Sequence, residues 1–473
     1  MDDDTIIDGP LYESRKKVYP QAVHGRFRTI KWTLLVFALS VYYLLPFVRW
    51  DRGPNLPNQA ILFDLPHRRF YFFFIELWPQ EIYYFTGLLI IAAMTLFFMN
   101  AVAGRIWCGY LCWQTVWTDL FFAVERWVEG DRRERMLKDK KGWTPARLRD
   151  AALKHFLWLM IAMLTGCSWV LYFADAPTLV HDMATLQAPL VAYASIGVLT
   201  FFTYFCAGHM HEQVCIYMCP WPRIQAALTD EWALNIEYRA DRGEPRISAK
   251  KAARLRAMGQ PAGDCVDCRQ CVAVCPAGGD IRRGSQLFCI QCGLCIDACD
   301  KVMKELGRKP GLIAYDNDIN IDRRRQGLDP IYRTVRARTI IYPAIIAVAG
   351  AIMVYALTTR ASLGVNVLHD RNPQATITSD GGVRDGYTVR LLNKRPETRK
   401  YNISVEGLPN ARIEIMGAQS GAGVEVGPDQ TLELRVMVIA PPGSVPAKAQ
   451  NVVFRIGDVV NGETATAKDY FFP

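Results

Sequence analysis

Eight cysteines between residues 265 and 299 form two copies of one pattern. The copies read Cys265-x2-Cys268-x2-Cys271-x3-Cys275-Pro276 and Cys289-x2-Cys292-x2-Cys295-x3-Cys299. Three thiolates on one tight loop can bind three irons of a [4Fe–4S] cubane, whereas the fourth cysteine in this spacing ligates the other cluster. The pattern therefore predicts two clusters that exchange one ligand. The predicted ligand sets are Cys265, Cys268, Cys271 and Cys299 for the first cluster, and Cys289, Cys292, Cys295 and Cys275 for the second.

Zinc and disulfide bonds are the other common fates of clustered cysteines. Zinc ribbons use two cysteine pairs, so eight cysteines in this register would be an unusual way to bind zinc. The second copy ends with Asp300 in place of a proline, a change that removes no ligand. All 14 cysteines lie at or before Cys299, which favours thiolate chemistry in a reducing compartment over a disulfide scaffold.

Two further cysteine pairs share a C-x-Y-x-C pattern. They are Cys108-Gly-Tyr-Leu-Cys112 and Cys215-Ile-Tyr-Met-Cys219, each preceded by an Ala-Gly pair, at 103–104 and 207–208. This repeat predicts two related membrane hairpins that bring four thiols together. In a helix, the i,i+4 spacing would also place both sulfurs of a pair on one face. Soft thiolates prefer Cu(I), zinc or iron–sulfur clusters, so copper binding, a further cluster and inert buried cysteines all remain open.

Three residues beside the second pair are weaker candidates for metal binding. His209 and His211 could supply imidazole nitrogens, and Met218 could supply a thioether sulfur. A position at the membrane interface or in a packed core explains each of them equally well. Cys167 and Cys206 lie inside or at the ends of apolar segments, and we interpret them as core residues.

Five apolar segments approach the length of about 20 residues that a membrane-spanning helix requires. They are residues 33–48, 82–102, 156–174, 190–206 and 339–357. The fourth is the weakest because tyrosine, serine and threonine residues dilute it, and a buried helix is its alternative interpretation. The chain of 473 residues is 51% hydrophobic and 21% charged, which suits apolar spans joined to soluble parts.

Lysine and arginine are unevenly distributed between the segments that flank these spans. Residues 1–31 hold six, 104–154 hold eleven and 207–338 hold 21, whereas 49–81 hold four and 175–189 hold none. The positive-inside rule therefore predicts a cytoplasmic N-terminus and cysteine region and an external C-terminus. The same distribution accounts for the net charge of +9 without nucleic acid. No dinucleotide fingerprint, P-loop or haem-attachment motif occurs in the sequence.

The C-terminal part, residues 359–473, lacks cysteine and shows the period-two pattern of strands. The clearest alternating segments are 387–392, 400–405, 431–438 and 452–456. Short strands separated by Gly, Pro and Asp over about 110 residues predict a small Ig-like β-sandwich.

The predicted fold class is a multi-domain membrane protein, with an α-helical bundle of five spans, a two-cluster ferredoxin-like insert and a C-terminal sandwich. The expected parts are a cytoplasmic N-terminal segment (1–31), a four-span domain (32–206), a cytoplasmic region (207–338) with the ferredoxin-like segment at about 260–305, a fifth helix (339–358) and a periplasmic sandwich (359–473).

These features together resemble the CcoG/FixG/RdxA family of cytochrome oxidase accessory proteins. The matching stretches are residues 11–20, 107–112 with 114–119, and 212–220, followed in the family's order by the doubled ferredoxin pattern, the fifth span and the tail. The resemblance covers essentially the whole chain. Two positions depart from the family pattern: Trp113 stands where a proline usually follows the first pair, and His211 stands where an arginine is expected.

The resemblance implies a protein of the bacterial inner membrane that reduces Cu(II) to Cu(I) during assembly of a cbb-type haem–copper oxidase. Copper would be reduced near Cys108, Cys112, Cys215 and Cys219, with electrons from the two clusters. The implied partners are the membrane, oxidase assembly factors or copper chaperones, and an electron donor. Two other functions remain open: a quinol dehydrogenase-type subunit that feeds a periplasmic partner, and a non-enzymatic assembly scaffold that senses redox state.

Overall fold

The computed structural model describes residues 17–53, 56–371, 375–395, 397–416, 423–428 and 430–473. Residues 11–16, which begin the first family-like stretch, lie outside the described residues. The chain forms two compact units, one of Met1–Trp50 with Gln59–Met353 and one of Asp51–Asn58 with Val354–Pro473. The cysteine region therefore shares a unit with the apolar helices, and the strand-rich tail forms the second unit.

Five helices among the described residues are long and apolar enough to cross a membrane. They are α1 (Arg26–Leu44) with the 3-10 turn η1 (Leu45–Phe47), α2 (Tyr83–Ala103), α6 (Pro145–Val170), α8 (Leu190–Thr203) with the π-helical η3 (Tyr204–Met210), and α15 (Ala337–Thr358). Most of their apolar side chains are exposed or only partly buried, and Leu190 and Val191 of α8 are among the exposed ones. Such surfaces are stable in lipid and costly in water, so the predicted membrane domain of five spans is confirmed.

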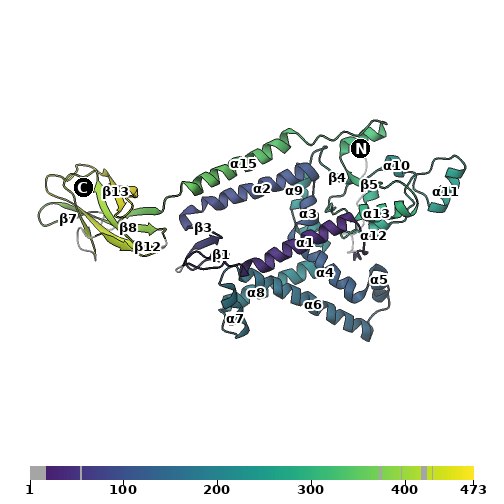
Figure 1. Cartoon of the computed structure of the whole chain (residues 1–473), viewed down its shortest axis with the longest axis horizontal. Coiled ribbons are helices and arrows are strands. Elements are labelled where there is room, and N and C mark those ends of the chain that lie inside the picture. Colours follow the sequence, from purple (N-terminus) through teal and green to yellow (C-terminus); the bar gives the residue numbers. More distant parts are fainter. Residues whose placement is uncertain (1–16, 54–55, 372–374, 396, 417–422, 429) are drawn as a thin grey trace, which may run out of the picture. The chain divides into compact units, whose positions relative to one another are not determined.

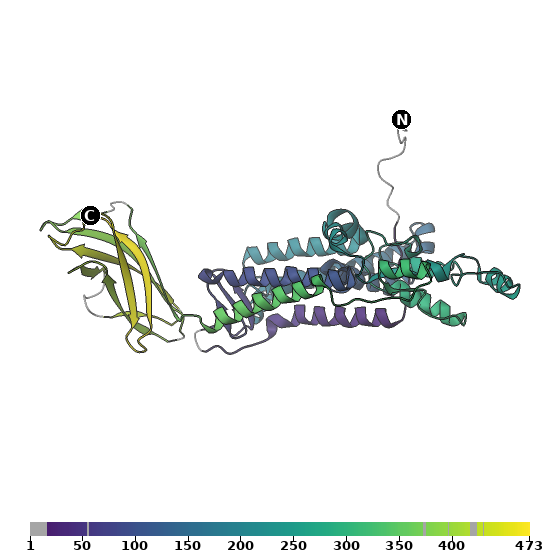
Figure 2. The same cartoon turned by 90° about the horizontal axis from the view of Figure 1, so that it is seen from above.

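Close packing of small residues joins these helices. A Cβ atom on Gly166 of α6 would lie 2.9 Å from the carbonyl oxygen of Ile196 in α8 and 3.1 Å from the Thr200 hydroxyl. The polar residues that weaken the fourth apolar segment therefore include one that faces a neighbouring helix, as is common in membranes. Likewise, α2 and α15 lie side by side in both views, with Gly87 against Met353 (Figures 1 and 2).

The predicted cluster-binding region gathers beyond one end of the long helices (Figure 1). Strand β4 (Asn235–Tyr238) pairs antiparallel with β5 (Ile313–Asp316), and between them the chain forms α11 (Ala249–Ala257), α12 (Gln270–Ala273) and α13 (Leu294–Glu305). Ile236, Met303 and Leu312 form the core of this region. Asp297 of α13 accepts hydrogen bonds from the first backbone N–H groups of α1 at Phe27 (3.2 Å) and Arg28 (2.8 Å), which ties the region to the helix bundle.

Shorter elements connect these parts. They are a three-stranded sheet of β1 (Ile61–Asp64), β2 (Arg69–Phe72) and β3 (Ile75–Leu77) after α1, the helices α3 (Ile106–Tyr110), α4 (Trp113–Glu129), α5 (Arg132–Lys140), α7 (Ala176–Ala184), α9 (Trp221–Leu228), α10 (Ala240–Gly243) and α14 (Asp318–Arg325), the 3-10 turns η2 (Pro79–Glu81) and η5 (Ile281–Arg283), and the π-helical η4 (Val214–Met218). Of these, α3 and η4 carry the first cysteine of each C-x-Y-x-C pair.

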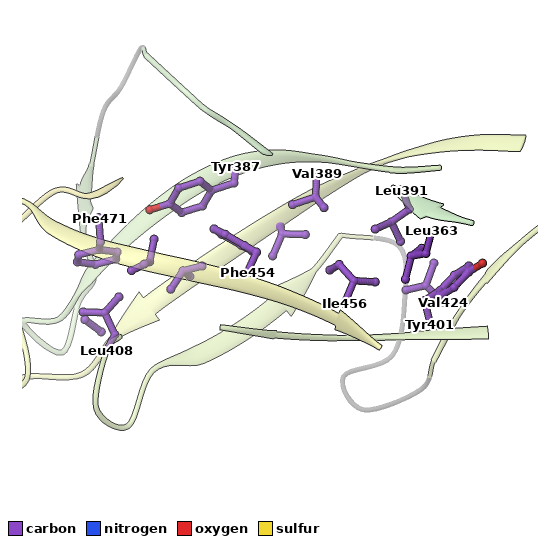
Figure 3. Close-up of a cluster of buried hydrophobic side chains, with 14 of the residues drawn as sticks. Leu363, Tyr387, Val389, Leu391, Tyr401, Leu408, Val424, Phe454, Ile456 and Phe471 are labelled. Atoms are coloured by element: carbon purple, nitrogen blue, oxygen red, sulfur yellow. The ribbon is translucent and has the colours of Figure 1, made fainter. Parts of the chain in front are cut away.

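The second unit is a β-sandwich, as predicted. One sheet has the order β10-β12-β8-β6, with β7 also paired to β8, and the other has the order β11-β9-β13-β14. The strands are β6 (Leu363–His369), β7 (Thr376–Ile377), β8 (Val383–Asn393), β9 (Arg399–Glu406), β10 (Arg412–Ile415), β11 (Val424–Val426), β12 (Gln430–Ala440), β13 (Gln450–Asp458) and β14 (Thr464–Phe471). Alternate side chains of both sheets, among them Tyr387, Phe454 and Phe471, fill the space between them (Figure 3). Each of the four alternating segments falls within a strand.

Candidate iron–sulfur and copper centres

The two copies of the ferredoxin pattern share an unusual backbone. Asp267 and Gln291, each directly before the second cysteine of its copy, have left-handed φ angles of 53° and 54°. Arg269 and Gly293, each directly after that cysteine, are also left-handed, with φ angles of 57° and 77°. Helices α12 and α13 then begin at the next residue. The loops therefore turn sharply on both sides of the central cysteine, which lets three cysteines of one short segment face a common centre.

Cys299 lies beside the first three cysteines of the opposite copy. Burial, followed by the neighbouring groups of Cys271, Asp300, Cys265 and Cys268, raises the pKa of Cys299 to about 12. Cys299 therefore lies near the three cysteines with which the spacing predicts that it shares a cluster.

Cys275 lies correspondingly beside the second copy. Burial and the nearby sulfur of Cys292 raise the pKa of Cys275 to about 11, although its sulfur also accepts a hydrogen bond from the Gly279 N–H (3.3 Å). Burial, Cys292 and Cys275 together raise the pKa of Cys289 to about 12. Each predicted set thus offers four cysteine sulfurs, of which only that of Cys268 belongs to an exposed residue, and such a donor set suits a [4Fe–4S] cluster.

The C-x-Y-x-C pairs lie on two hairpins with the same backbone path. We define the first hairpin as residues 104–113 and the second as residues 211–221. Gly104 (φ 51°, ψ −121°) and His211 (φ 45°, ψ −113°) each stand four residues before the first cysteine of their pair. The second cysteines, Cys112 (φ −64°, ψ 131°) and Cys219 (φ −81°, ψ 122°), are both extended. The repeat is therefore structural, and its register matches Gly104 with His211 instead of with Gly208.

Neither pair has the helical i,i+4 geometry considered from the sequence. Helix α3 ends at Tyr110 and η4 ends at Met218, so the second cysteine of each pair has already left the helix. The extended conformation at these cysteines turns the chain toward α4 in the first hairpin and toward α9 in the second.

The two hairpins bring Cys108, Cys112, Cys215 and Cys219 together, and we call these the hairpin thiols. Burial, followed by the sulfurs of the other three, raises the pKa of Cys108 to about 12. Burial, Cys112, Cys219 and Glu212 likewise raise the pKa of Cys215 to about 12. Within the described part of the chain, no three His, Cys, Asp or Glu side chains are already arranged around a single ion. The four hairpin thiols are therefore neighbours, although they belong to two separate hairpins.

The first hairpin packs directly on the second cluster loop. A Cβ atom on Gly109 would lie 2.7 Å from the Ile290 carbonyl oxygen and 3.1 Å from the Cys292 Cα. The Tyr110 hydroxyl donates a hydrogen bond to the Cys292 carbonyl (2.9 Å), and the Arg105 N–H donates one to Gln291 Oε1 (2.8 Å). Backbone therefore touches backbone between the hairpin thiols and a predicted cluster ligand, a contact that only glycine permits.

The weaker candidates have different surroundings. His211 is buried and stacks on Phe122 of α4, with ring centroids 4.6 Å apart and planes 6° apart. His209 stacks on His155 of α6 at 5.7 Å. Met218 is 58% exposed beside Cys219. The histidines therefore pack among aromatic rings, whereas the thioether lies at the surface of the second hairpin.

Several residues that shape this region did not stand out in the sequence. Gln225 of α9 accepts a hydrogen bond from the Cys108 thiol (3.3 Å), and the Thr115 hydroxyl donates to the Cys108 carbonyl (2.6 Å). Gly109 was the one available signal, because a glycine between two candidate ligands indicates a close approach of another backbone. Cys167 and Cys206 lie half-buried in α6 and η3.

Three protein-family models match the chain. A "4Fe-4S dicluster domain" matches residues 210–318, and a "4Fe-4S binding domain" matches residues 85–133. The "IG-like fold at C-terminal of FixG" matches residues 353–473. The first two matches include all eight cysteines of the ferredoxin pattern and all four hairpin thiols.

The chain is also similar to characterised bacterial proteins over most of its length. It is 48% identical to "Nitrogen fixation protein FixG" of Rhizobium meliloti over 92% of this chain and 89% of that protein. It is 44% identical to "Protein RdxA" of Cereibacter sphaeroides over 98% of both chains. It is 47% identical to "Protein RdxB" of the same organism over 94% of this chain and 93% of that protein.

These similarities agree with the architecture of apolar helices, doubled ferredoxin loops and terminal sandwich. The identities extend across both compact units, so they concern the whole arrangement and not one domain. The chain therefore belongs to the FixG/RdxA family of membrane-associated iron–sulfur proteins.

Proposed function

We propose that this protein is an oxidoreductase that reduces Cu(II) to Cu(I) at the hairpin thiols, and that the Cu(I) serves assembly of a cbb-type haem–copper oxidase. Copper is the substrate in this proposal. The observation that carries it is the meeting of four thiols from two separate hairpins against the loop that contains Cys292. Soft sulfur ligands stabilise Cu(I) relative to Cu(II), so a site of this composition favours the reduced product.

The ligand sets predicted from the spacing would hold two [4Fe–4S] clusters. A bound cluster supplies one electron at a time, which balances the reduction of one Cu(II) to one Cu(I). The protein's own residues bring the two centres together: Gly109 removes the side chain between them, and Tyr110 and Arg105 hydrogen-bond the second loop to the first hairpin. This packing supports short-range electron transfer from the second ligand set to the hairpin thiols.

The hairpin thiols must lose protons to bind copper. Burial and mutual repulsion raise the pKa of Cys108 and of Cys215 to about 12, so a soft cation that binds there displaces protons.

The distribution of Lys and Arg supports an orientation in the bacterial inner membrane. In it the N-terminus and both groups of cysteines face the cytoplasm, and the sandwich faces the periplasm. Copper reduction then takes place on the cytoplasmic side or within the membrane, and oxidase assembly factors or copper chaperones receive the product.

The test is anaerobic and uses the full-length protein with its clusters reduced. Cu(II) is added while cluster absorbance and a Cu(I)-specific chelator are followed, for the wild type and for the quadruple Cys→Ser variant at 108, 112, 215 and 219. We expect the wild type to reoxidise as Cu(I) appears, and the variant to retain its clusters but stall. If Cu(II) leaves the wild-type clusters reduced, the protein is not a cupric reductase.

A further iron–sulfur cluster at the hairpin thiols is the second candidate. One observation favours it: a family model described as 4Fe-4S binding covers Cys108 and Cys112. Iron analysis separates the two candidates, because three clusters give about 12 irons per chain and two give about eight. The quadruple Ser variant would then lose about four irons, whereas a copper site predicts no loss.

A further inference from the structure

A cavity of about 460 Å³ lies at the start of α1, next to the second cluster loop. Its walls come from the segment 20–25, the first two turns of α1, and α4. Pro276 and Leu294, which directly follow Cys275 and directly precede Cys295, close it on the ferredoxin side. The hairpin thiols do not line this cavity, so it is separate from the proposed copper site.

Positive charge dominates the polar side chains of this cavity. Arg28 donates two hydrogen bonds to Asp119, both at 2.8 Å, and Lys31 lies 3.8 Å from the same carboxylate. Arg126 also lines the cavity, and within the described residues its side chain makes no hydrogen bond or ion pair. Of the charged side chains Arg28, Arg126 and Asp119 that line the cavity, the Asp119 carboxylate is thus already paired with Arg28.

The charged groups near Arg126 affect the pKa of its guanidinium in opposite directions. Burial, followed by repulsion from Arg28, lowers the pKa of Arg126, although Asp119 and Asp131 act in the opposite direction. Asp131 is itself engaged, because it accepts a hydrogen bond from the Ala22 N–H (3.0 Å) and caps α5. A half-buried guanidinium next to a second guanidinium is a poor arrangement unless an anion enters between them.

The remaining walls indicate where such an anion comes from. Trp32 and Phe122 supply aromatic surface, and Thr29 and Thr33 lie exposed on the first turns of a membrane-spanning helix. Tryptophan and arginine at the end of a span are typical of the layer in which lipid headgroups lie. A ligand with an anionic head and an apolar remainder fits these walls better than a small soluble anion.

We propose that this cavity binds a phosphoryl group, and that the source is the headgroup of an anionic phospholipid. Arg126 and Arg28 would pair with the phosphate oxygens, and Trp32 would cover the glycerol end of the lipid. Since Pro276 and Leu294 form part of the wall, the bound headgroup would join the cluster loop to α1 and α4. This inference is independent of copper reduction.

The experiment is native mass spectrometry of the full-length, cluster-loaded protein in detergent. The probes are phosphatidylglycerol, phosphatidylcholine and inorganic phosphate, each titrated against the wild type, Arg126→Gln and Arg133→Gln. Arg133 is the matched control, because it is an exposed arginine at the start of α5 and does not line the cavity. Cluster absorbance checks that each variant is folded.

We expect the wild type to retain phosphatidylglycerol in preference to phosphatidylcholine. Arg126→Gln should weaken that binding by about ten-fold or more, as loss of a charge-assisted hydrogen bond does, and Arg133→Gln should leave it unchanged. Arg126→Lys should bind with intermediate strength, because it keeps the charge and loses the planar fork. If inorganic phosphate binds with the same dependence on Arg126 and the lipid does not, the phosphoryl site stands and its ligand is soluble. Equal lipid binding by Arg126→Gln and Arg133→Gln overturns the proposal.

Discussion

The two cysteine hairpins share a motif and a backbone path but differ in what covers them. In the first hairpin, Tyr110 is 6% exposed and its hydroxyl donates a hydrogen bond to the Cys292 carbonyl. Tyr217, at the matching position of the second hairpin, is 71% exposed. Gly109 touches the cluster loop, and its counterpart Ile216 has a full side chain. The first hairpin is therefore docked on the predicted electron source, and the second presents its surface outward.

The two hairpins of the repeat therefore differ in what their surfaces can contact. Docking demands small residues and fixed hydrogen bonds, because backbone must approach backbone. The open face of the second hairpin has Met218 and Tyr217 at its surface, beside Cys219. Under the cupric-reductase function proposed above, the first hairpin would serve electron entry and the second would serve metal exchange.

The largest effect is expected from Gly109→Ile. This substitution places in the first hairpin the residue type that stands at the matching position of the second, Ile216. The added side chain would collide with the backbone of Ile290 and Cys292, so we expect a loss of roughly 3 kcal/mol or more in stability. Thermal loss of cluster absorbance measures it. Ile216→Gly is the matched control and should cost only about 1 kcal/mol, since Ile216 is half-buried. Equal losses of stability in the two variants would mean that both hairpins pack against their neighbours in the same way.

A pH titration tests the buried Glu237 carboxyl in β4. Burial, followed by repulsion from Asp318 and Asp316, raises the pKa of Glu237 in β4 from 4.5 to about 7. The folded state therefore favours the protonated carboxyl, which contributes its stability fully below pH 4.5 and loses it as the pH rises through about 7.

We expect Glu237→Gln to be more stable than the wild type by roughly 2 to 3 kcal/mol at pH 8 and to match it at about pH 4. Thermal melts of the two proteins at both pH values measure the difference. A stability gap that is independent of pH would contradict the assignment of the titrating group to Glu237.

Substitutions at Gly104 and His211 test why position 104 is a glycine. The cause is either its positive φ angle or the side chains that crowd its Cα. Both have a positive φ near 50°, but a Cβ on Gly104 would meet Asn235 and would lie 2.7 Å from Gln291 Oε1. We expect Gly104→Ala to cost about 2 kcal/mol. His211→Gly should change stability by less than about 1 kcal/mol, because relief of backbone strain offsets the lost stacking on Phe122. Chemical denaturation followed by tryptophan fluorescence compares the two, and a reversed order would show that crowding is not the cause.

The smallest effect is expected when the hydroxyl is removed from Tyr110 or from Tyr217, which occupy matching positions in the two hairpins. Tyr110→Phe removes the hydrogen bond to the Cys292 carbonyl and should cost about 1 kcal/mol. Tyr217→Phe should cost less than about 0.5 kcal/mol, because the side chain is exposed. Reoxidation of the clusters by Cu(II) should slow in the first variant alone. If both variants slow equally, the hydroxyl acts on copper and not on docking.

The local features of the chain follow from short stretches of its sequence. The spacing of cysteines predicted two ligand sets with exchanged fourth members, and the apolar and alternating patterns predicted the spans and strands. The predictions of helices and strands are confirmed because each depends on neighbours within a few residues: a helix on its apolar length and a strand on period two. The ligand sets stay a prediction, which depends in the same local way on the spacing of the cysteines.

How the ferredoxin cysteines and the hairpin thiols meet depends on the folding of the whole unit. Nothing in the C-x-Y-x-C motif distinguishes Tyr110 from Tyr217, and the Ala-Gly pairs pointed to Gly208 where the backbone matches Gly104 with His211. Likewise, the cavity beside Arg126 exists because α1, α4 and the cluster loop converge there. The physical reason is that docking depends on the shape and hydrogen bonding of segments far apart in the chain, and a local pattern does not encode which surfaces will touch.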